Sequence, residues 1–480
     1  MKKTGLVRLI IIFVGFFSLS LLFPLLIAVI FKEYNMFFSF LLPICCSLII
    51  SLPVFLSTKK EEINFQKSDG FLLVTLAWVI GSMIGALPYY LSGYVPHYSN
   101  AVFESVSGFT TTGATIIPDV EILPYSLHFW RGMTHWIGGM GIIVLTVALF
   151  PILGTGGFQL LKGETTGPMK EKFTPKVKDT AKVLWLIYCG FTLLQFILLM
   201  LGGMSWFDSV IHSFSTMGTG GFSTKNSSIA YYNSPYIEWV CSIFMFIAGF
   251  NFTLTFRLFQ GKVNEITKNS EARAYFFIVA VSVLTVTISL SRNLFPIGKS
   301  LRYAFFHVTS IMTTTGFMAD NHNAWPPLAK MVILGLMFIG GCSGSTAGGV
   351  KVIRYVILCK QMLNESKKIL FPKGVFSVHL DQKIGRKDVV YSVSGFVFVY
   401  FLFFFIGVFL LSGSGIDLFN SINASILLLG NIGLGFGKLI SGEIFYNLPE
   451  YMKWFFSLFM IIGRLEIYSV IILCFPFYWK

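Results

Sequence analysis

Residues 107–115 read SGFTTTGAT, and three further segments of the chain resemble them. TTTGF recurs at 313–317, HSFSTMGTGGF spans 212–222, and a looser version, GNIGLG, spans 430–435. Aligning the four segments places glycines 113, 221, 316 and 433 in one column, roughly 100 residues apart. A segment repeated at a regular interval indicates repeated structural units. We therefore expect four related units in this chain.

The composition is that of an integral membrane protein. Of the 480 residues, 55% are hydrophobic and only 12% charged, whereas about 25% are charged in soluble proteins. Apolar runs of about 20 residues, the length that crosses a bilayer, recur along the chain. The first run, 6–31, follows two lysines as in a signal peptide, but it is too long and has no small-residue cleavage site. It is predicted to be a membrane helix.

The basic residues indicate an orientation in the membrane. The net charge is +14, and 25 of the 36 Lys and Arg lie at the N-terminus and in four connections, near 57–69, 151–182, 257–273 and 351–388. Clusters of this kind mark the cytoplasmic side. They argue against nucleic acid as a partner. The seven cysteines show neither metal-ligand spacing nor a disulfide framework.

Ten spanning helices place all the basic segments on one side and all the glycine loops on the other. Helices at 6–31 and 37–56 lead, and pairs follow at 70–93 and 126–150, 182–203 and 236–259, 272–290 and 327–360, and 389–412 and 450–477. The predicted boundaries are 1–69 for the leading helices and 70–165, 166–261, 262–375 and 376–480 for the units. The predicted class is an all-α membrane protein with a pseudo-fourfold central pore. Both termini are expected in the cytoplasm.

The segment before each glycine is too short to cross a membrane. Residues 101–109, 209–217, 302–312 and 418–429 fit re-entrant half-helices instead. Asn100, Asp208 and Asp417 are expected to cap three of them. Half-helices that end inside the membrane direct their partly negative C-terminal ends inward, which favours a cation.

The loops themselves suit ion coordination. Irregular backbone at membrane depth must be buried in protein or line a watery cavity. Glycine permits unusual dihedral angles, and rings of carbonyls can replace the water around a cation. A single TTTG would more simply be a helix C-terminal turn. Its fourfold recurrence favours an ion filter.

These segments resemble the Trk/Ktr/HKT superfamily of potassium transporters, specifically its bacterial Trk-type uptake subunit. The resemblance covers the whole chain and rests on these motifs: FESVSGFTTTGAT (103–115), HWIGGMGIIVL (135–145), HSFSTMGTGGFST (212–224), SIMTTTGF (310–317), GGCSGSTAGGVKVIR (340–354), GNIGLG (430–435) and IGRLE (462–466).

The resemblance assigns the filter. The filter glycines would be Gly113, Gly221, Gly316 and Gly433, with Gly220 the alternative to Gly221 in the second loop. Potassium would meet the backbone carbonyls of Thr111, Thr112, Thr219, Gly220, Thr314, Thr315, Asn431 and Ile432. Loop 4 lacks the usual threonine. In the superfamily a serine at the first filter position accompanies sodium permeation, so Gly113 implies a preference for potassium.

The resemblance also implies a gate. The glycine-rich segment 340–349 interrupts a predicted helix and would form an intramembrane loop below the filter. Its gating residues would be Gly341, Cys342, Ser343, Gly344, Ser345, Thr346, Ala347, Gly348 and Gly349, together with Arg464. A plain helical kink is the alternative for the loop. A phosphate cradle is not supported, because GxxxxGK[ST] is missing.

Two charged residues in apolar segments, Arg464 and Glu104, each have two possible roles. Unpaired charge in a membrane helix is costly, so Arg464 is expected either to face the gate or to pair with Glu466. Glu104 in the first half-helix could attract cations or make a local hydrogen bond.

The function expected from the resemblance is potassium uptake across a bacterial inner membrane. It implies a homodimer in the lipid bilayer and a cytosolic nucleotide-binding subunit that docks on the basic loops, especially 151–182 and 351–388. The alternative is an ion-coupled secondary transporter that works by alternating access. No nucleophile, acid–base pair or metal-ligand motif is present in the sequence, so no enzyme or cofactor is expected, and potassium is the substrate.

Overall fold

The computed structural model describes residues 3–57, 67–153, 177–381, 383–384, 387–437 and 442–479. It is mostly helical, as predicted. The predicted domain boundaries at 165–166 and the basic segment 151–182 lie largely outside the described residues, as does most of 57–69.

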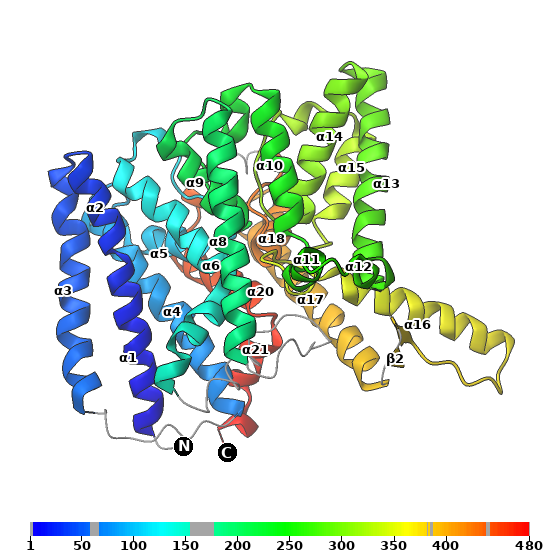
Figure 1. Cartoon of the computed structure of the whole chain (residues 1–480), viewed down its shortest axis with the longest axis horizontal. Helices are drawn as coiled ribbons and strands as arrows, with labels where there is room; N and C mark the ends of the chain where they lie inside the picture. The colour runs from blue at the N-terminus through cyan, green and yellow to red at the C-terminus, as the bar shows by residue number, and fades with distance from the viewer. Residues whose placement is uncertain are drawn as a thin grey trace.

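Three helices lead the chain: α1 (Lys3–Ser20), α2 (Leu22–Ile30) and α3 (Tyr34–Ser57). They pack at one edge of the molecule, and α13 to α16 lie at the opposite edge (Figure 1). Several side chains of α3, such as Phe38, Ile49 and Ile50, are exposed and apolar. Exposed apolar side chains on a helix this long are typical of contact with lipid.

The rest of the chain runs four times through a long helix, a short helix, a loop and further helices. The first unit contains α4 (Lys67–Leu91), α5 (Tyr98–Phe109), η1 (Val120–Ile122) and α6 (Tyr125–Leu153). The second contains α8 (Val177–Leu201), α9 (Trp206–Met217), η3 (Ser228–Tyr232), α10 (Pro235–Ala248), α11 (Phe252–Phe259) and α12 (Val263–Lys268).

The third contains α13 (Ser270–Asn293), α14 (Ile297–Met312), η4 (His322–Ala324), α15 (Pro327–Leu336) and α16 (Val352–Leu370), followed by strands β1 (His379–Leu380) and β2 (Lys383–Ile384), which pair antiparallel. The last contains α17 (Lys387–Gly413), α18 (Leu418–Gly430), α19 (Glu443–Tyr446), α20 (Glu450–Arg464), α21 (Tyr468–Ile471), η6 (Ile472–Cys474) and η7 (Pro476–Tyr478). Helix α16 projects away from the body (Figure 1).

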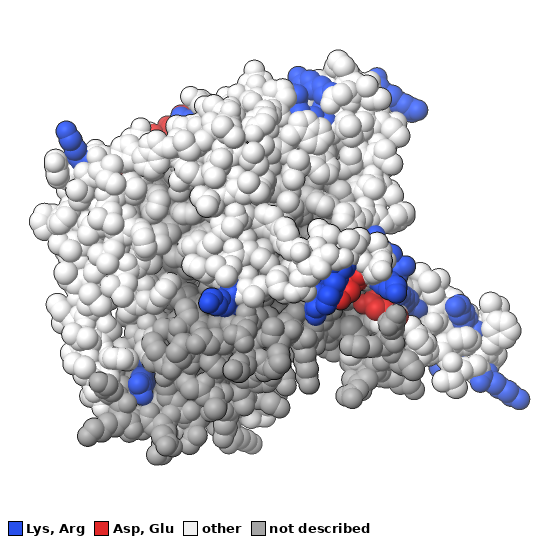
Figure 2. Space-filling view, in the orientation of Figure 1, with Lys and Arg blue, Asp and Glu red and all other residues white. Residues whose placement is uncertain are grey.

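Among the described residues, six helices are long and apolar enough to cross a membrane, or eight if each of two bent pairs is counted as one span. On the face drawn in Figure 2, most of the described charged side chains lie near the upper rim and around α11, α12 and α16, further basic groups lie at the lower left, and the surface between the upper and lower groups is uncharged. This distribution is that of a protein embedded in a bilayer.

The prediction of continuous helices over 236–259 and 450–477 is wrong. The first bends by 102° between α10 and α11, and the second by 113° between α20 and α21. Helix α6, predicted as an unbroken span at 126–150, contains non-helical dihedrals at Gly141. Asn251 caps the new start of α11 by accepting hydrogen bonds from the N–H groups of Thr253 and Leu254. Apolar composition predicts that a segment is buried in the membrane but not that it stays straight.

The short helices form the interior. Every residue of α5 from Ser99 to Phe109 is buried, and so are the last seven residues of α14 and the last eight of α18. The predicted starts were late by several residues in three of them, and α14 has 16 residues rather than about eleven. Asp417 caps α18 as predicted, whereas Ser205 rather than Asp208 caps α9, and His97 precedes α5 without a side-chain cap.

Candidate functional site

The four short helices end in the same backbone geometry. Two residues before each aligned glycine the chain is left-handed, with φ of 52° at Thr111, 56° at Thr219, 58° at Thr314 and 53° at Asn431. The next N–H then bonds the carbonyl five residues earlier, in the pairs Thr112–Ser107, Gly220–Ser215, Thr315–Ser310 and Ile432–Leu427. This six-residue closure is the Schellman ending of a helix. It turns the chain out of each helix in the same direction.

The aligned glycines share a second feature. The φ angles are 76° at Gly113, 81° at Gly221, 82° at Gly316 and 77° at Gly433, a region that side chains disfavour. Gly220 is not among the residues of positive φ. In backbone geometry Gly221 therefore matches the other three.

The loops that end in these glycines, 110–113, 218–221, 313–316 and 430–433, are called here glycine loops 1 to 4. They pack against one another in a closed cycle. A Cβ added to any aligned glycine would collide with a backbone carbonyl oxygen of the next loop in the cycle. The colliding pairs are Gly113 with Gly220, Gly221 with Thr315, Gly316 with Ile432, and Gly433 with Thr112. Each glycine thus touches the carbonyl that precedes the next glycine, and these four contacts close the cycle of loops.

A polar side chain on three of the short helices holds a residue beyond its own loop. Glu104, His212 and His307 each lie nine residues before the aligned glycine. Glu104 accepts from the N–H of Ile116 at 2.9 Å, His212 Nε2 lies 3.0 Å from Ser223 Oγ, and His307 Nε2 accepts from the N–H of Asp320 at 3.2 Å. The fourth such position is Ala424, and there His322 Nε2 lies 3.1 Å from the Gly435 carbonyl. Of the two roles left open for Glu104, local hydrogen bonding is thus the one observed.

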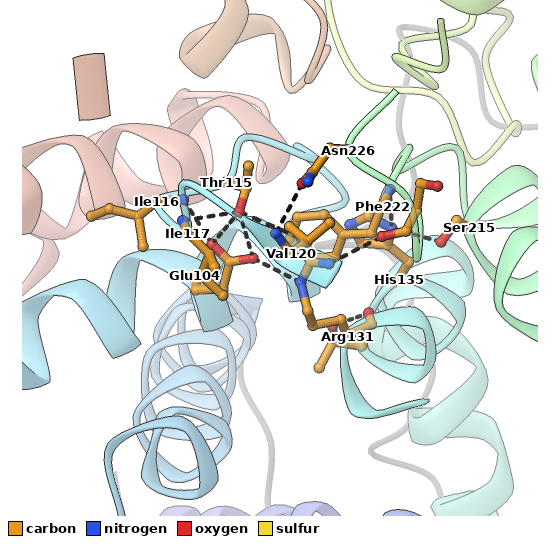
Figure 3. Close-up of polar contacts among 12 residues, drawn as sticks. Glu104, Thr115, Ile116, Ile117, Val120, Arg131, His135, Ser215, Phe222 and Asn226 are labelled. Atoms are coloured by element: carbon orange, nitrogen blue, oxygen red, sulfur yellow. Dashed lines mark hydrogen bonds and ion pairs between the residues drawn. The ribbon is translucent and has the colours of Figure 1, made fainter. Parts of the chain in front are cut away.

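Outer segments of units 1 and 2 are also joined. Asn226 Oδ1 accepts from the N–H of Val120 at 2.9 Å (Figure 3). Asn226 Nδ2 donates to Asp119 Oδ1 at 2.7 Å. The amide of Asn226 and the N–H of Glu121 both donate to Asp119, and they lower the pKa of its carboxyl group. This carboxylate is exposed and stays ionised at neutral pH.

The glycine-rich segment 340–349 leaves the helical path entirely. Helix α15 ends at Leu336 and α16 starts at Val352. In between, the chain folds back under glycine loops 2 and 3: Gly348 N–H donates to Thr314 Oγ1 at 2.7 Å, and Thr219 Oγ1 donates to the Thr346 carbonyl at 2.9 Å. The segment 340–349, named here the intramembrane loop, therefore lies directly against the residues that precede two of the aligned glycines.

Arg464 contacts this loop. Its Nη1 donates to the Thr346 carbonyl at 2.8 Å, and its Nη2 donates to the carbonyl of Gly138 at 2.8 Å. Glu466, the partner considered from the sequence, forms an ion pair with Arg354. Arg464 lies at the end of α20, at the 113° bend. The bend brings a charged group from unit 4 to the loop of unit 3.

A buried glutamate holds both the intramembrane loop and the start of α16. Glu271 on α13 is 5% exposed, and its Oε1 accepts from the N–H of Ser343 at 2.7 Å and from that of Ile353 at 3.2 Å. The Nζ of buried Lys351 donates to the Ala347 carbonyl. Glu271 was not among the predicted site residues, because no local sequence pattern indicates that a residue at the start of one helix contacts a loop some 70 residues later.

Comparison with known proteins identifies the family. The family model described as TrkH, cation transport protein, matches residues 36–294 and 284–480. This chain belongs to the TrkH family. The Trk system potassium uptake protein TrkH of Halomonas elongata is 35% identical over 484 residues, and that of Escherichia coli K12 is 36% identical over 486. Both alignments cover all of this chain and all of the relative.

A solved structure has the same fold. The crystal structure of the potassium transporter TrkH from Vibrio parahaemolyticus superposes with a TM-score of 0.89 at 32% sequence identity and covers all of both chains. The resemblance to bacterial Trk-type subunits that the sequence motifs suggested is therefore confirmed. Relatives in the TrkH family are named as uptake proteins rather than enzymes.

Proposed function

We propose that this TrkH-family protein takes up potassium through a channel-like pore across the bacterial inner membrane. One observation carries the proposal: the closed cycle in which each aligned glycine touches the carbonyl that precedes the next. Four converging carbonyls can replace the hydration shell of an alkali cation. The names of the relatives, which specify potassium uptake, support the choice of ion.

The proposed filter consists of Gly113, Gly221, Gly316 and Gly433 with the carbonyls of the two residues before each of them. The four short helices direct their C-terminal ends toward it, which adds a favourable field for a cation. The inside-negative membrane potential, about 2.3 kcal/mol per charge per 100 mV, would drive inward movement.

The proposed gate is the intramembrane loop with Arg464. Its hydrogen bonds to Thr219 and Thr314 place it against the filter loops, and the guanidinium of Arg464 adds a positive charge beside it. A cation leaving the filter toward the cytoplasm would meet both obstacles. Displacement of the loop would open the path.

The proposal also includes a second copy of the chain and a cytosolic regulatory subunit. The protein would act as a homodimer in the lipid bilayer, and a cytosolic nucleotide-binding subunit would move the gate from the basic inner segments. One of these segments, 351–388, includes α16, which projects from the body, whereas 151–182 lies largely outside the described residues.

Flux measurements on purified protein test the function. Proteoliposomes that contain the protein are loaded with potassium and diluted into low-potassium buffer without valinomycin. Potassium efflux through the protein then makes the interior negative, and the liposomes should take up ⁸⁶Rb⁺. External potassium should compete strongly and sodium weakly. Unitary currents in planar bilayers would support the pore, whereas uptake that requires a second ion gradient and shows no unitary openings would support the coupled transporter. A lack of selective uptake would contradict the proposal.

A further inference from the structure

A buried ion pair lies immediately outside glycine loops 1 and 2. Arg131 Nε on α6 is 2.9 Å from Glu104 Oε1 on α5, and the two side chains are 2% and 0% exposed (Figure 3). Burying two charges is expensive, and replacing such a pair with apolar residues often costs no stability. A role in stability alone therefore explains this pair poorly.

The carboxylate holds the chain that leaves loop 1. Glu104 accepts hydrogen bonds from the N–H of Ile116 at 2.9 Å and from Thr115 Oγ1 at 3.1 Å. These residues follow Gly113 by three and two positions. Glu104 thus joins the body of the short helix to the exit of its own glycine loop.

The guanidinium holds the chain that leaves loop 2. Arg131 Nη1 donates to the Ser223 carbonyl at 3.2 Å, and the guanidinium carbon lies 4.1 Å from the centre of the Phe222 ring. These are the first two residues after Gly221. Charge-assisted hydrogen bonds and cation–π contacts away from water are strong and directional. The ion pair therefore links the exits of two neighbouring loops.

The other short helices do this differently. The position equivalent to Glu104 is His212 in unit 2, His307 in unit 3 and Ala424 in unit 4. Holding the backbone after a glycine loop therefore does not itself require a charged residue. The charged pair adds a contact with the neighbouring unit, because Arg131 also binds Phe222 and Ser223 of unit 2.

We propose that the Glu104–Arg131 ion pair sets the spacing between glycine loops 1 and 2 and so determines how strongly the pore prefers potassium over sodium. Both residues act by positioning, through backbone that they hold, and neither touches the ion. The inference rests on the proposed function. Without the link, the carbonyls of Thr112 and Gly220 could move apart, and their geometry would no longer favour the larger ion.

Two variants separate position from charge. Arg131→Lys keeps a cation beside Glu104 but loses the planar fork that also reaches Ser223. The double variant Glu104→Gln, Arg131→Gln removes both charges and leaves no unpaired ion. The glutamine side chain at position 131 is too short to reach Ser223 after glycine loop 2. Because the double variant carries no buried charge, we expect it to fold even if the lysine variant is unstable.

The matched control is Glu238→Gln. Glu238 on α10 is 2% exposed and pairs at 2.6 Å with Arg302 on α14, which is 17% exposed. The hydrogen bonds and the ion pair of Glu238 involve neither a glycine loop nor the residues that follow one. Losing this charge tests whether any buried ion pair affects selectivity by general destabilisation.

Sodium inhibition of ⁸⁶Rb⁺ uptake is measured in proteoliposomes, together with the elution profile and melting temperature of each protein. We expect half-inhibition by sodium at about tenfold lower concentration for both loop variants, the factor set by one lost charge-assisted hydrogen bond, and no change for Glu238→Gln. Wild-type sodium sensitivity in the folded double variant, or the same loss in Glu238→Gln, would overturn the inference. Non-selective uptake by the wild type would instead overturn the proposed function.

Discussion

At the scale of single residues, glycine is required where the loops meet. Gly113 has a φ of 76°, and a Cβ there would strike the Gly220 carbonyl. Two independent obstacles, backbone strain and a clash with a neighbouring loop, therefore oppose any side chain. Arg464 is also specified by its surroundings, since three backbone carbonyls accept hydrogen bonds from its guanidinium.

Gly113→Ser should weaken discrimination between potassium and sodium by about tenfold, because strain of about 1–3 kcal/mol must be relieved by moving the Gly220 carbonyl. Sodium inhibition of ⁸⁶Rb⁺ uptake measures the effect. Gly93→Ser is the matched control, since Gly93 has a φ of 78° but no atom within 4 Å of its added Cβ. Equal sodium sensitivity of the two variants would contradict the assignment of Gly113 to the filter.

Arg464→Gln should raise uptake by the protein without a partner, by about fivefold, because removing a nearby charge lowers the barrier to a cation by about 1 kcal/mol. Initial ⁸⁶Rb⁺ uptake into proteoliposomes reports the change. Arg257→Gln, which removes a half-exposed pair with Glu265, serves as the control. If both variants match the wild type, Arg464 is not part of the gate.

At the scale of elements, the second long helix of every unit is interrupted. The interruptions are at Gly141 in α6, between α10 and α11, at 337–351 between α15 and α16, and between α20 and α21. Two of these breaks are joined by hydrogen bonds, since the N–H of Cys342 donates to the Gly249 carbonyl at 2.9 Å. The intramembrane loop is therefore supported by the break in a neighbouring unit and by Glu271.

Glu271→Ala should release Ser343 in the intramembrane loop and Ile353 beyond it and raise partner-free uptake at least about tenfold, because each buried N–H group left without an acceptor costs about 1–3 kcal/mol. Glu271→Gln keeps an acceptor oxygen and should have a smaller effect. Time courses of ⁸⁶Rb⁺ entry distinguish the variants. A folded alanine variant with wild-type uptake would show that these anchors do not hold the gate closed.

At the scale of the whole molecule, the structure gives the protein two polar ends and an apolar middle. The first helix starts, and the last helices end, at the same end of the molecule (Figure 1). Helix α12 lies toward that end as well, whereas the loop between α13 and α14 lies at the other. With basic segments inside, both termini would be cytoplasmic.

Single cysteines on a cysteine-free background should confirm this orientation. Lys299→Cys, which starts α14, should react in intact cells with a membrane-impermeant maleimide. Lys262→Cys beside α12 should react only after the membrane is permeabilised, because the reagent carries a charge and does not cross lipid. The reverse pattern would show that the protein is inverted relative to the prediction.

Sequence alone determined the membrane class, the family and the four aligned glycines, because apolar length, charge distribution and the repeated glycine are local properties. The choice between Gly220 and Gly221 depended on dihedral angles, which sequence spacing constrains only weakly. The tertiary structure alone decided the bends in α10–α11 and α20–α21, the partners of Glu104 and Arg464, and the anchoring by Glu271. These features arise from contacts between residues up to about 330 positions apart, such as Arg464 with Gly138. A hydrogen bond across that separation exists only once packing has brought both groups together, so no local pattern encodes it.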